Sequence, residues 1–301
     1  MRLFNSERFA DHLTPPGHPE RPERAEVLRR VALEWAARGH QLDEPVPADD
    51  ATLSLVHAPA YVAAIRETAG HAIRLDADTT TSPDSYDVAR LAAGAVIEGI
   101  RHVLATPDDP AAVLVRPPGH HAEVATAMGF CLFNSIAVGA AWARRQGLQR
   151  VAIVDFDVHH GNGTEDIIAG DERVLMVSFF QHPLYPFSGG TPLGTNMLNL
   201  PVPAYTRGPA IRELIEMMWM PRLEEFKPQM VFISAGFDAH REDELGQLGL
   251  IEADYEWITA RLMALAARHA QGRIVSCLEG GYSLSALARS VAAHLRVLAD
   301  M

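Results

Sequence analysis

Cysteine is scarce in this sequence of 301 residues, and long uninterrupted apolar runs are missing. The two cysteines, Cys131 and Cys277, lie in the apolar segments GFCLFN and IVSCLEG. We therefore expect two buried free thiols rather than a disulfide or a cysteine-based metal site. No run approaches the roughly 18 apolar residues of a membrane span, and the first residues lack the apolar core of a signal peptide. The sequence therefore predicts a cytoplasmic protein that does not enter a membrane.

An excess of positive charge is also absent. The formal net charge is −12, which argues against a nucleic-acid-binding surface. The sequence contains no phosphate-binding loop, no Ser-His-Asp nucleophile elbow and no dinucleotide fingerprint, so three common enzyme classes are disfavoured. Because 48% of the residues are hydrophobic and 21% are charged, we expect a globular protein with a substantial core.

Short apolar runs alternate with helical patterns along most of the chain. The predicted strands are 111–115, 151–157, 173–179, 230–235 and 274–277. The predicted helices are 23–38, 56–68, 84–105, 134–145, 208–226, 253–270 and 283–299, with a further helix beginning at 164–169. This alternation predicts βαβ crossovers and a three-layer α/β fold with a mostly parallel sheet. Since no repeat or linker interrupts it, we expect a single domain over residues 1–301.

Four polar motifs follow directly on apolar strands. They are RPPGHH, DFDVHHGNG, AGFDAH and LEGGY. The functional residues of parallel sheets gather at the carboxyl ends of the strands, so we expect these four motifs to meet in one site.

The segment VAIVDFDVHHGNGT suggests a metal site. Asp155, Asp157 and His159 alternate, so a strand continuing through His159 would direct all three side chains to one face. Buried carboxylates repel each other without a cation, whereas a solvated strand end is the simpler alternative for this segment alone. With Asp238 from AGFDAH, Asp157 and His159 would form a three-ligand site that leaves positions open for water and substrate.

His120 and His121 are the candidate bases, although a His-His pair is more often a packing feature. Asp155 behind one imidazole would hold it charged, and Asn162 behind the other would leave it closer to neutral. Tyr282 follows two glycines that permit a tight turn, and it either donates its hydroxyl to a developing oxyanion or packs at a strand end. Metal, base and hydroxyl donor together indicate hydrolysis of a carbonyl compound.

Five motifs, RPPGHHA, GFCLFN, DFDVHHGNGT, SAGFDAH and EGGY, occur in an order that resembles zinc-dependent histone deacetylases and acetylpolyamine amidohydrolases. The resemblance runs from about His18 to the C-terminus. It implies the arginase/deacetylase fold, with an eight-stranded parallel sheet between helices, and a single deacetylase domain over residues 1–301. It also implies catalytic Zn²⁺ bound by Asp157, His159 and Asp238. A structural K⁺ is implied beside the strand, at Asp155, Asp157, His159 and the region of Ser178.

The same resemblance implies roles in catalysis. His121 is similar to the family's general base and later acid, and His120 to the charged partner held by Asp155. Tyr282 resembles the tyrosine that polarises the scissile carbonyl. Asn162 stands where class I deacetylases carry aspartate, so the chain resembles the class II branch.

Substrate-binding residues follow from the resemblance as well. Gly129 and Phe130 match the substrate-channel segment, in which a backbone carbonyl accepts the substrate amide proton, and Tyr185 replaces a second channel phenylalanine. Aromatic walls suit a straight acyl-lysine stem. Leu245 falls where the polyamine-selective class IIb enzyme has a glutamate, and the loop 181–195 is short, which favours acyl-lysine over polyamine.

The leading hypothesis is a zinc amidohydrolase that removes acetyl or other acyl groups from lysine side chains of proteins or peptides. The first alternative is the same chemistry on acetylated polyamines or another small amide. A non-catalytic acyl-lysine-binding module is disfavoured because no metal ligand and no tyrosine is lost. A binuclear manganese ureohydrolase shares the fold but needs more aspartate ligands than these motifs supply.

Overall fold

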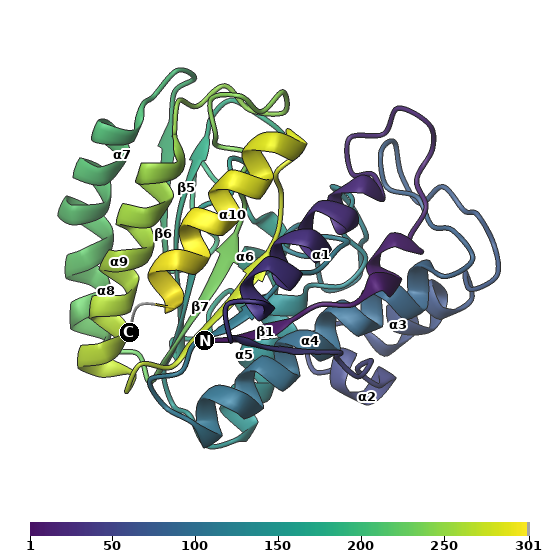
Figure 1. The fold of residues 1–301 in the computed structure, drawn as a ribbon, viewed down its shortest axis with the longest axis horizontal. Helices are drawn as coiled ribbons and strands as arrows, with labels where there is room; N and C mark the ends of the chain where they lie inside the picture. Colours follow the sequence, from purple (N-terminus) through teal and green to yellow (C-terminus); the bar gives the residue numbers. More distant parts are fainter. Residues whose placement is uncertain (300–301) are drawn as a thin grey trace.

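One eight-stranded sheet organises the chain in the computed structural model, which describes residues 1–299 (Figure 1). The strand order is β2-β1-β3-β8-β7-β4-β5-β6, and every neighbouring pair is parallel. The strands are β1 Arg2–Phe4, β2 Gln41–Asp43, β3 Ala111–Val113, β4 Val151–Asp155, β5 Val174–Gln181, β6 Met197–Val202, β7 Met230–Ala235 and β8 Ile274–Leu278. The prediction of an α/β fold with a parallel sheet is therefore confirmed.

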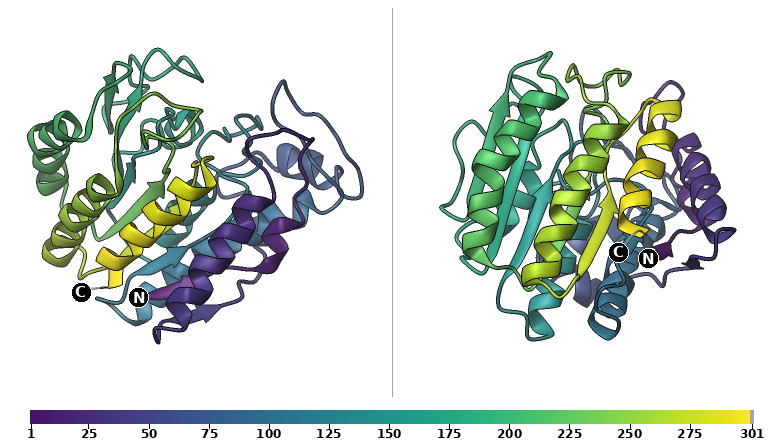
Figure 2. Two further views of the ribbon diagram at one scale, coloured as in Figure 1. Left: turned by 45° about the horizontal axis from the view of Figure 1, so that its top comes forward. Right: turned by 60° about the vertical axis from the view of Figure 1, so that its left-hand side comes forward.

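Helices cover both faces of this sheet (Figures 1 and 2). The α-helices are α1 Glu23–Ala36, α2 Asp50–Leu53, α3 Pro59–Arg66, α4 Ser85–Ala105, α5 Ser135–Arg145, α6 Asn162–Ile168, α7 Gly208–Leu214, α8 Met220–Phe226, α9 Glu252–His269 and α10 Leu284–Ala299. Two short helices complete the set, the 3₁₀ helix η1 Glu7–Ala10 and the π-helix η2 Ile215–Trp219.

The core lies in two layers because strand side chains alternate between the two faces of the sheet. In β4, Ala152 and Val154 pack in the layer beneath α1, α9 and α10, whereas Val151 and Ile153 pack in the layer beneath α4 and α5. All five residues of β4 are buried, as an apolar run between two helical layers predicts. Both cysteines are buried and free, which confirms that expectation.

Three strands escape prediction from the sequence. β2 and β6 are the two edge strands, and both include partly exposed positions, so neither reads as a continuous apolar run. β1 is only 3 residues long. The segment 208–226, predicted as one helix, consists of α7, η2 and α8 in succession. α6 begins at Asn162, two positions before the predicted start.

The strand β4 ends at Asp155 and does not continue to His159, which corrects the prediction of an extended segment. The Asp157 N–H donates to Asp155 Oδ1 at 3.0 Å, and the His159 N–H donates to Asp157 Oδ1 at 2.9 Å. Aspartate side chains that bond to the backbone two residues onward favour turns over strands. The alternation therefore produces two successive turns instead of one polar strand face.

Both ends of the described chain lie at the amino edge of the sheet, away from the carboxyl edge. β1 begins at Arg2, and α10 runs back from the carboxyl edge after β8 (Figure 1). Within residues 1–299, no helix combines the length and the apolar character needed to cross a bilayer.

Candidate active site

Three potential metal ligands converge at the carboxyl edge. Asp157 and His159 follow β4, and Asp238 follows the neighbouring strand β7. One donor atom from each lies within 4.8 Å of the others, and all three residues are buried. His159 Nδ1 is 3.0 Å from Asp157 Oδ1 and 3.2 Å from Asp238 Oδ2. We call these three residues the metal cluster.

The metal cluster carries negative charge without a matching arginine or lysine. Within residues 1–299, only histidines form ion pairs with its two carboxylates. Burial and then the neighbouring Asp157 raise the pKa of Asp238 to about 7. Although burial opposes it, hydrogen bonding with the two carboxylates raises the pKa of His159 to about 10. Two buried carboxylates and one imidazole are a donor set that suits a catalytic divalent cation such as Zn²⁺, so these residues fit the metal.

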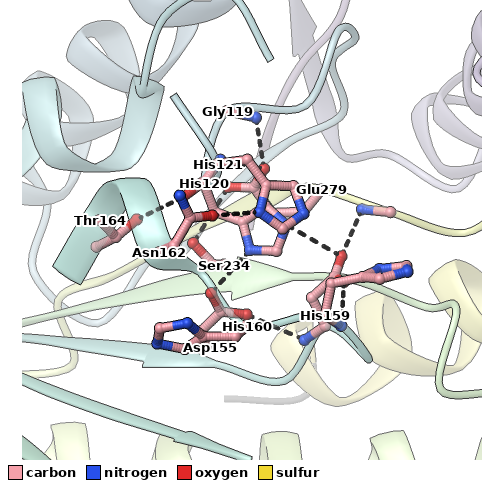
Figure 3. Close-up of polar contacts among 12 residues, drawn as sticks. Gly119, His120, His121, Asp155, His159, His160, Asn162, Thr164, Ser234 and Glu279 are labelled. Atoms are coloured by element: carbon pink, nitrogen blue, oxygen red, sulfur yellow. Dashed lines mark hydrogen bonds and ion pairs between the residues drawn. The ribbon is translucent and has the colours of Figure 1, made fainter. Parts of the chain in front are cut away.

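His120 and His121 follow β3 and have different partners (Figure 3). His120 Nδ1 lies 2.9 Å from Asp155 Oδ2, and His121 Nδ1 lies 2.8 Å from Asn162 Oδ1. Burial alone would lower the pKa of His120, but Asp157 and Asp155 outweigh it and raise the pKa well above its ordinary value. Burial and the charges of His120 and His159 lower the pKa of His121 well below its ordinary value. The two imidazoles therefore differ in charge, as their partners predict.

The hydrogen-bond network also assigns the proton on His121. The Asn162 amide nitrogen donates to Glu123 Oε1 at 2.9 Å, which directs the amide oxygen toward His121. Because that oxygen can only accept, His121 Nδ1 carries the hydrogen, and Nε2 of the neutral ring holds a free lone pair. His121 also lines the cavity described next, so its side chain is available to a bound molecule.

A cavity of about 210 Å³ opens onto this group of residues. Its lining brings together His121, His159 and Tyr282 with all four predicted channel residues. The full lining is Asp78, His121, Gly129, Phe130, His159, Leu184, Tyr185, Leu245 and Tyr282. The Phe130 ring meets the Tyr282 ring edge-on at 5.8 Å between centroids, and the Tyr185 ring meets His121 at 5.3 Å. The cavity is thus an aromatic-walled passage that reaches the imidazoles of His121 and His159.

The segment from Glu279 to Tyr282 closes one side of the site. A Cβ at Gly280 would lie 2.0 Å from Asp238 Oδ2, so only glycine permits this approach to the metal cluster. Gly281 has φ +121°, where glycine is strongly favoured. The Gly280 N–H donates to Asp157 Oδ2 at 2.9 Å. This backbone therefore holds Asp157, a candidate metal ligand, while it presents Tyr282 to the cavity.

Sequence reasoning missed several residues that support the site. Arg24 is fully buried, donates to the carbonyls of Gly281 at 2.7 Å and Glu279 at 2.6 Å, and lies 4.8 Å from the Tyr282 ring centroid. Asp78 lines the cavity from a segment that reads as irregular loop. The charged segment HPERPER, residues 18–24, contains Arg24, but its charge density does not reveal which arginine is buried, since Arg21 is exposed.

Two residues of the implied K⁺ site lie in neighbouring strands. Asp155 in β4 lies directly opposite Ser178 in β5. Ser178 is buried, and its hydroxyl oxygen has no hydrogen-bond partner among the described residues. A buried oxygen without a partner is consistent with an oxygen-liganded cation at this position.

Comparisons with known proteins place the chain in a family. The model of the histone deacetylase domain matches residues 18–298, so the chain belongs to the histone deacetylase family, a family of hydrolases. It is 38% identical to the histone deacetylase-like amidohydrolase of Pseudomonas aeruginosa, over 89% of this chain and 73% of that protein. It is 37% identical to a probable deacetylase of Archaeoglobus fulgidus, over 92% of this chain and 80% of that protein.

The fold agrees with that assignment. The crystal structure of the HDA15 HD domain superposes with a TM-score of 0.91 at 33% identity, covering 99% of this chain and 88% of the other. The predictions of the family and of its arginase/deacetylase fold are therefore confirmed.

Proposed function

We propose that this protein is a zinc-dependent amidohydrolase that removes acetyl or other acyl groups from lysine side chains of proteins or peptides. The observation that carries the proposal is one cavity that joins the neutral imidazole of His121, Tyr282 and His159 of the metal cluster behind aromatic walls. Asp157, His159 and Asp238 would hold Zn²⁺, which when bound supplies a Lewis acid for the carbonyl and lowers the pKa of water.

The cavity walls suit the substrate. Phe130, Tyr185 and Leu245 would enclose the aliphatic stem of the acyl-lysine, because apolar and aromatic walls favour a methylene chain over water. The backbone carbonyl of Gly129 would accept the substrate amide proton, as the family resemblance implies. These contacts orient the scissile amide toward the metal cluster.

In the reaction, His121 Nε2 takes a proton from the attacking water, since its lone pair is free and its Nδ1 proton is held by Asn162. Tyr282 donates its hydroxyl to the oxygen that becomes negative as the carbonyl is attacked. His120 remains charged against Asp155 and stabilises the negative charge that develops nearby. His121 then passes its proton to the departing amine, which completes the hydrolysis to a carboxylate and a free lysine side chain.

Asp78 favours a second candidate substrate, an acetylated polyamine. Its carboxyl group lines the cavity, where it could pair with a distal ammonium. Burial and the neighbouring Asp76 raise the pKa of Asp78, which weakens that attraction. Leu245 offers no charge, so acyl-lysine remains the leading substrate. A Leu245→Glu change should shift preference toward the diamine.

The test is acetate release by zinc-loaded protein, run in parallel on an acetyl-lysine peptide and an acetylated diamine. Faster release from the peptide supports the lysine deacylase. Faster release from the diamine supports the same amide hydrolysis, with an acetylated polyamine instead of acyl-lysine as the substrate. If neither substrate releases acetate and longer acyl chains are not hydrolysed either, an acyl-lysine-binding module would be favoured. Tight peptide binding without turnover would identify it.

A His121→Ala variant tests the assigned base. We expect hydrolysis to be nearly abolished while zinc content stays at the wild-type level, because His121 is not in the metal cluster. A loss of zinc from this variant would show that a ligand has been misassigned. His71→Ala, which changes an exposed histidine in the loop after α3, is the matched control and should behave as wild type.

Further features belong to the same proposal. We assign residues 1–301 to a single deacetylase domain of the class II type, because Asn162 replaces aspartate and Tyr282 is retained. The K⁺ beside Ser178 would be structural rather than catalytic. The cytoplasmic location and the lack of a nucleic-acid partner stay predictions from composition and charge.

A further inference from the structure

We propose that Glu279 is a positioning residue for the His120–His121 pair, acting through hydrogen bonds to the backbone of their loop. The inference rests on the proposed role of His121 as the base. Glu279 has 1% of its surface exposed. The hydrolysis mechanism proposed above assigns it no role. A buried carboxyl group needs partners, and those of Glu279 come from the loop after β3 and from β7.

The position of Glu279 follows from the strand order. It directly succeeds β8, which lies between β3 and β7 in the sheet. The Glu279 N–H donates to the Ala235 carbonyl at 3.0 Å, which continues the pairing of β8 with β7 for one more residue. Its side chain can therefore reach the loop after β3 on one side and the end of β7 on the other.

The side chain bonds to both neighbours (Figure 3). Glu279 Oε2 accepts the N–H of Gly119 at 2.6 Å and the N–H of His120 at 3.1 Å. Glu279 Oε1 accepts the hydroxyl of Ser234, in β7, at 3.1 Å. Among the described residues, neither the Gly119 nor the His120 N–H has a backbone acceptor. One carboxyl group thus satisfies two buried backbone donors of the loop that carries both histidines.

These bonds bear on the histidine pair because the loop has few other restraints on its N–H side. The His120 carbonyl accepts from the Thr164 N–H at 3.0 Å, so α6 fixes the opposite side of the same peptide chain. The imidazoles then reach Asp155 and Asn162 at 2.9 and 2.8 Å. Without Glu279, two unsatisfied donors would turn toward water or another acceptor, and the loop would move away from Asp155 and Asn162.

Three variants of Glu279 separate reach from charge. Glu279→Gln can place its amide oxygen at the two N–H groups and donate to Ser234, so it keeps all three bonds without the charge. Glu279→Ala removes the bonds. Glu279→Asp keeps the charge but withdraws the oxygens by one methylene. Ser234→Ala is the matched control, because it removes the third bond and leaves both loop bonds in place.

We expect Glu279→Ala and Glu279→Asp to lower kcat about 10²-fold with KM little changed, because the base is misplaced while the channel walls are intact. Glu279→Gln should stay within about fivefold of wild type, and Ser234→Ala within about threefold. Wild-type kcat in Glu279→Ala would overturn the proposal. So would a Glu279→Gln variant as impaired as Glu279→Ala, since charge rather than reach would then matter. If Glu279→Ala does not fold, the contrast between Gln and Asp decides in the same way.

A spectroscopic measurement keeps this test independent of activity. The amide protons of Gly119 and His120, bonded to a carboxyl oxygen, should resonate far downfield in wild type and move upfield in Glu279→Ala and Glu279→Asp. Unshifted amide signals in both variants would overturn the proposal even if activity fell. If wild type hydrolyses no N-acyl substrate, the proposed function fails, and the amide signals still report whether Glu279 holds the loop.

Discussion

Two groups of buried charges lie next to each other in this protein, and they differ in the partners of their carboxylates. In the arginine cluster, made of Glu20, Arg24 and Arg116, one carboxylate accepts from Arg24 at 2.9 Å and from Arg116 twice at 2.7 Å. All three side chains are fully buried. Arg116 Nη1 donates to the carbonyls of both Phe9 and His12. The other two nitrogens of the Arg24 guanidinium donate to the carbonyls of Gly281 and Glu279.

The metal cluster has the opposite balance. Its two carboxylates have only imidazoles as partners, and burial together with Asp157 raises the pKa of Asp238 to about 7. In the arginine cluster, burial alone would raise the pKa of Glu20, but Arg116 and Arg24 outweigh it and lower the pKa to about 2. The comparison teaches that a buried carboxylate paired with arginines indicates a structural role, whereas two buried carboxylates that have only histidines as partners indicate a site for a cation.

Asp238→Asn, in the metal cluster, should have the largest effect. We expect zinc binding to be lost and hydrolysis to fall at least 10³-fold, because one ligand and its charge are removed. The unfolding free energy of the metal-free protein should not fall, since the repulsion between two buried carboxylates is relieved. Metal analysis, acetate release and urea unfolding with chelator measure the three effects. Glu242→Gln, an exposed change in the same loop, is the control. A clear loss of metal-free stability would show that the two carboxylates of the metal cluster do not destabilise the metal-free protein.

The corresponding change in the arginine cluster, Glu20→Gln, should act on stability. Two buried guanidinium groups would lose their anion, and we expect the unfolding free energy to fall by about 3 kcal/mol. Glu225→Gln breaks an exposed ion pair with Arg222 and should change the unfolding free energy by less than about 0.5 kcal/mol. Denaturant unfolding of both variants provides the measurement. Equal effects from the two changes would contradict the distinction drawn here.

Tyr282 joins the two groups, because it faces the cavity while its ring contacts Arg24. We expect Tyr282→Phe to lower turnover about 10²-fold, as the loss of one oxyanion donor does, with zinc content and thermal midpoint close to wild type. The phenylalanine ring keeps the contact with Arg24, so the arginine cluster should be unaffected. Unchanged turnover would remove Tyr282 from the mechanism.

Acid should reveal the arginine cluster through the dependence of stability on pH. The pKa of Glu20 is about 2 in the folded protein against an ordinary 4.5, so its contribution is complete above pH 4.5 and is lost as the pH falls toward 2. Burial lowers the pKa of the adjacent His12 from 6.5 to about 4, so the unfolded chain takes up a proton first and stability falls from pH 6.5 to 4.

Urea unfolding at several pH values checks these signs. Wild type and Glu20→Gln should lose stability in parallel between pH 6.5 and 4.5, because both retain His12. Below pH 4.5 the difference between them should shrink by about 1.4 kcal/mol per pH unit, as the wild-type carboxylate is titrated in the unfolded state. A difference that stays constant down to pH 3 would mean that the charge of Glu20 contributes nothing.

The sequence predicted those features that depend on neighbouring residues. The run Val151 to Val154 reads as a buried strand because it packs between two layers, and the polar motifs follow strand ends because a parallel sheet aligns those ends. It did not predict the end of β4, since the turns at Asp157 and His159 depend on which acceptor each backbone N–H finds. The edge strand β6 was also missed, because its outer positions are only partly buried.

Contacts between distant segments were beyond sequence reasoning. Glu20 meets Arg116 across 96 positions, and Glu279 meets Gly119 across 160. Glu279 lies in the EGGY motif, but its partner is fixed only when the sheet brings β8 beside β3. Glu20 lies outside the motifs, before α1. Asp78 likewise comes from a loop without periodic pattern, and its place at the cavity depends on the tertiary fold.

The placement of both chain ends at the amino edge of the sheet has a practical consequence. A protein tethered to a bead or sensor surface through residues near Arg2 would present the carboxyl edge, and with it the cavity, to the solution (Figure 1). Enzyme coupled in this way should therefore hydrolyse its substrate at a rate close to that of the free enzyme, without a spacer between protein and surface.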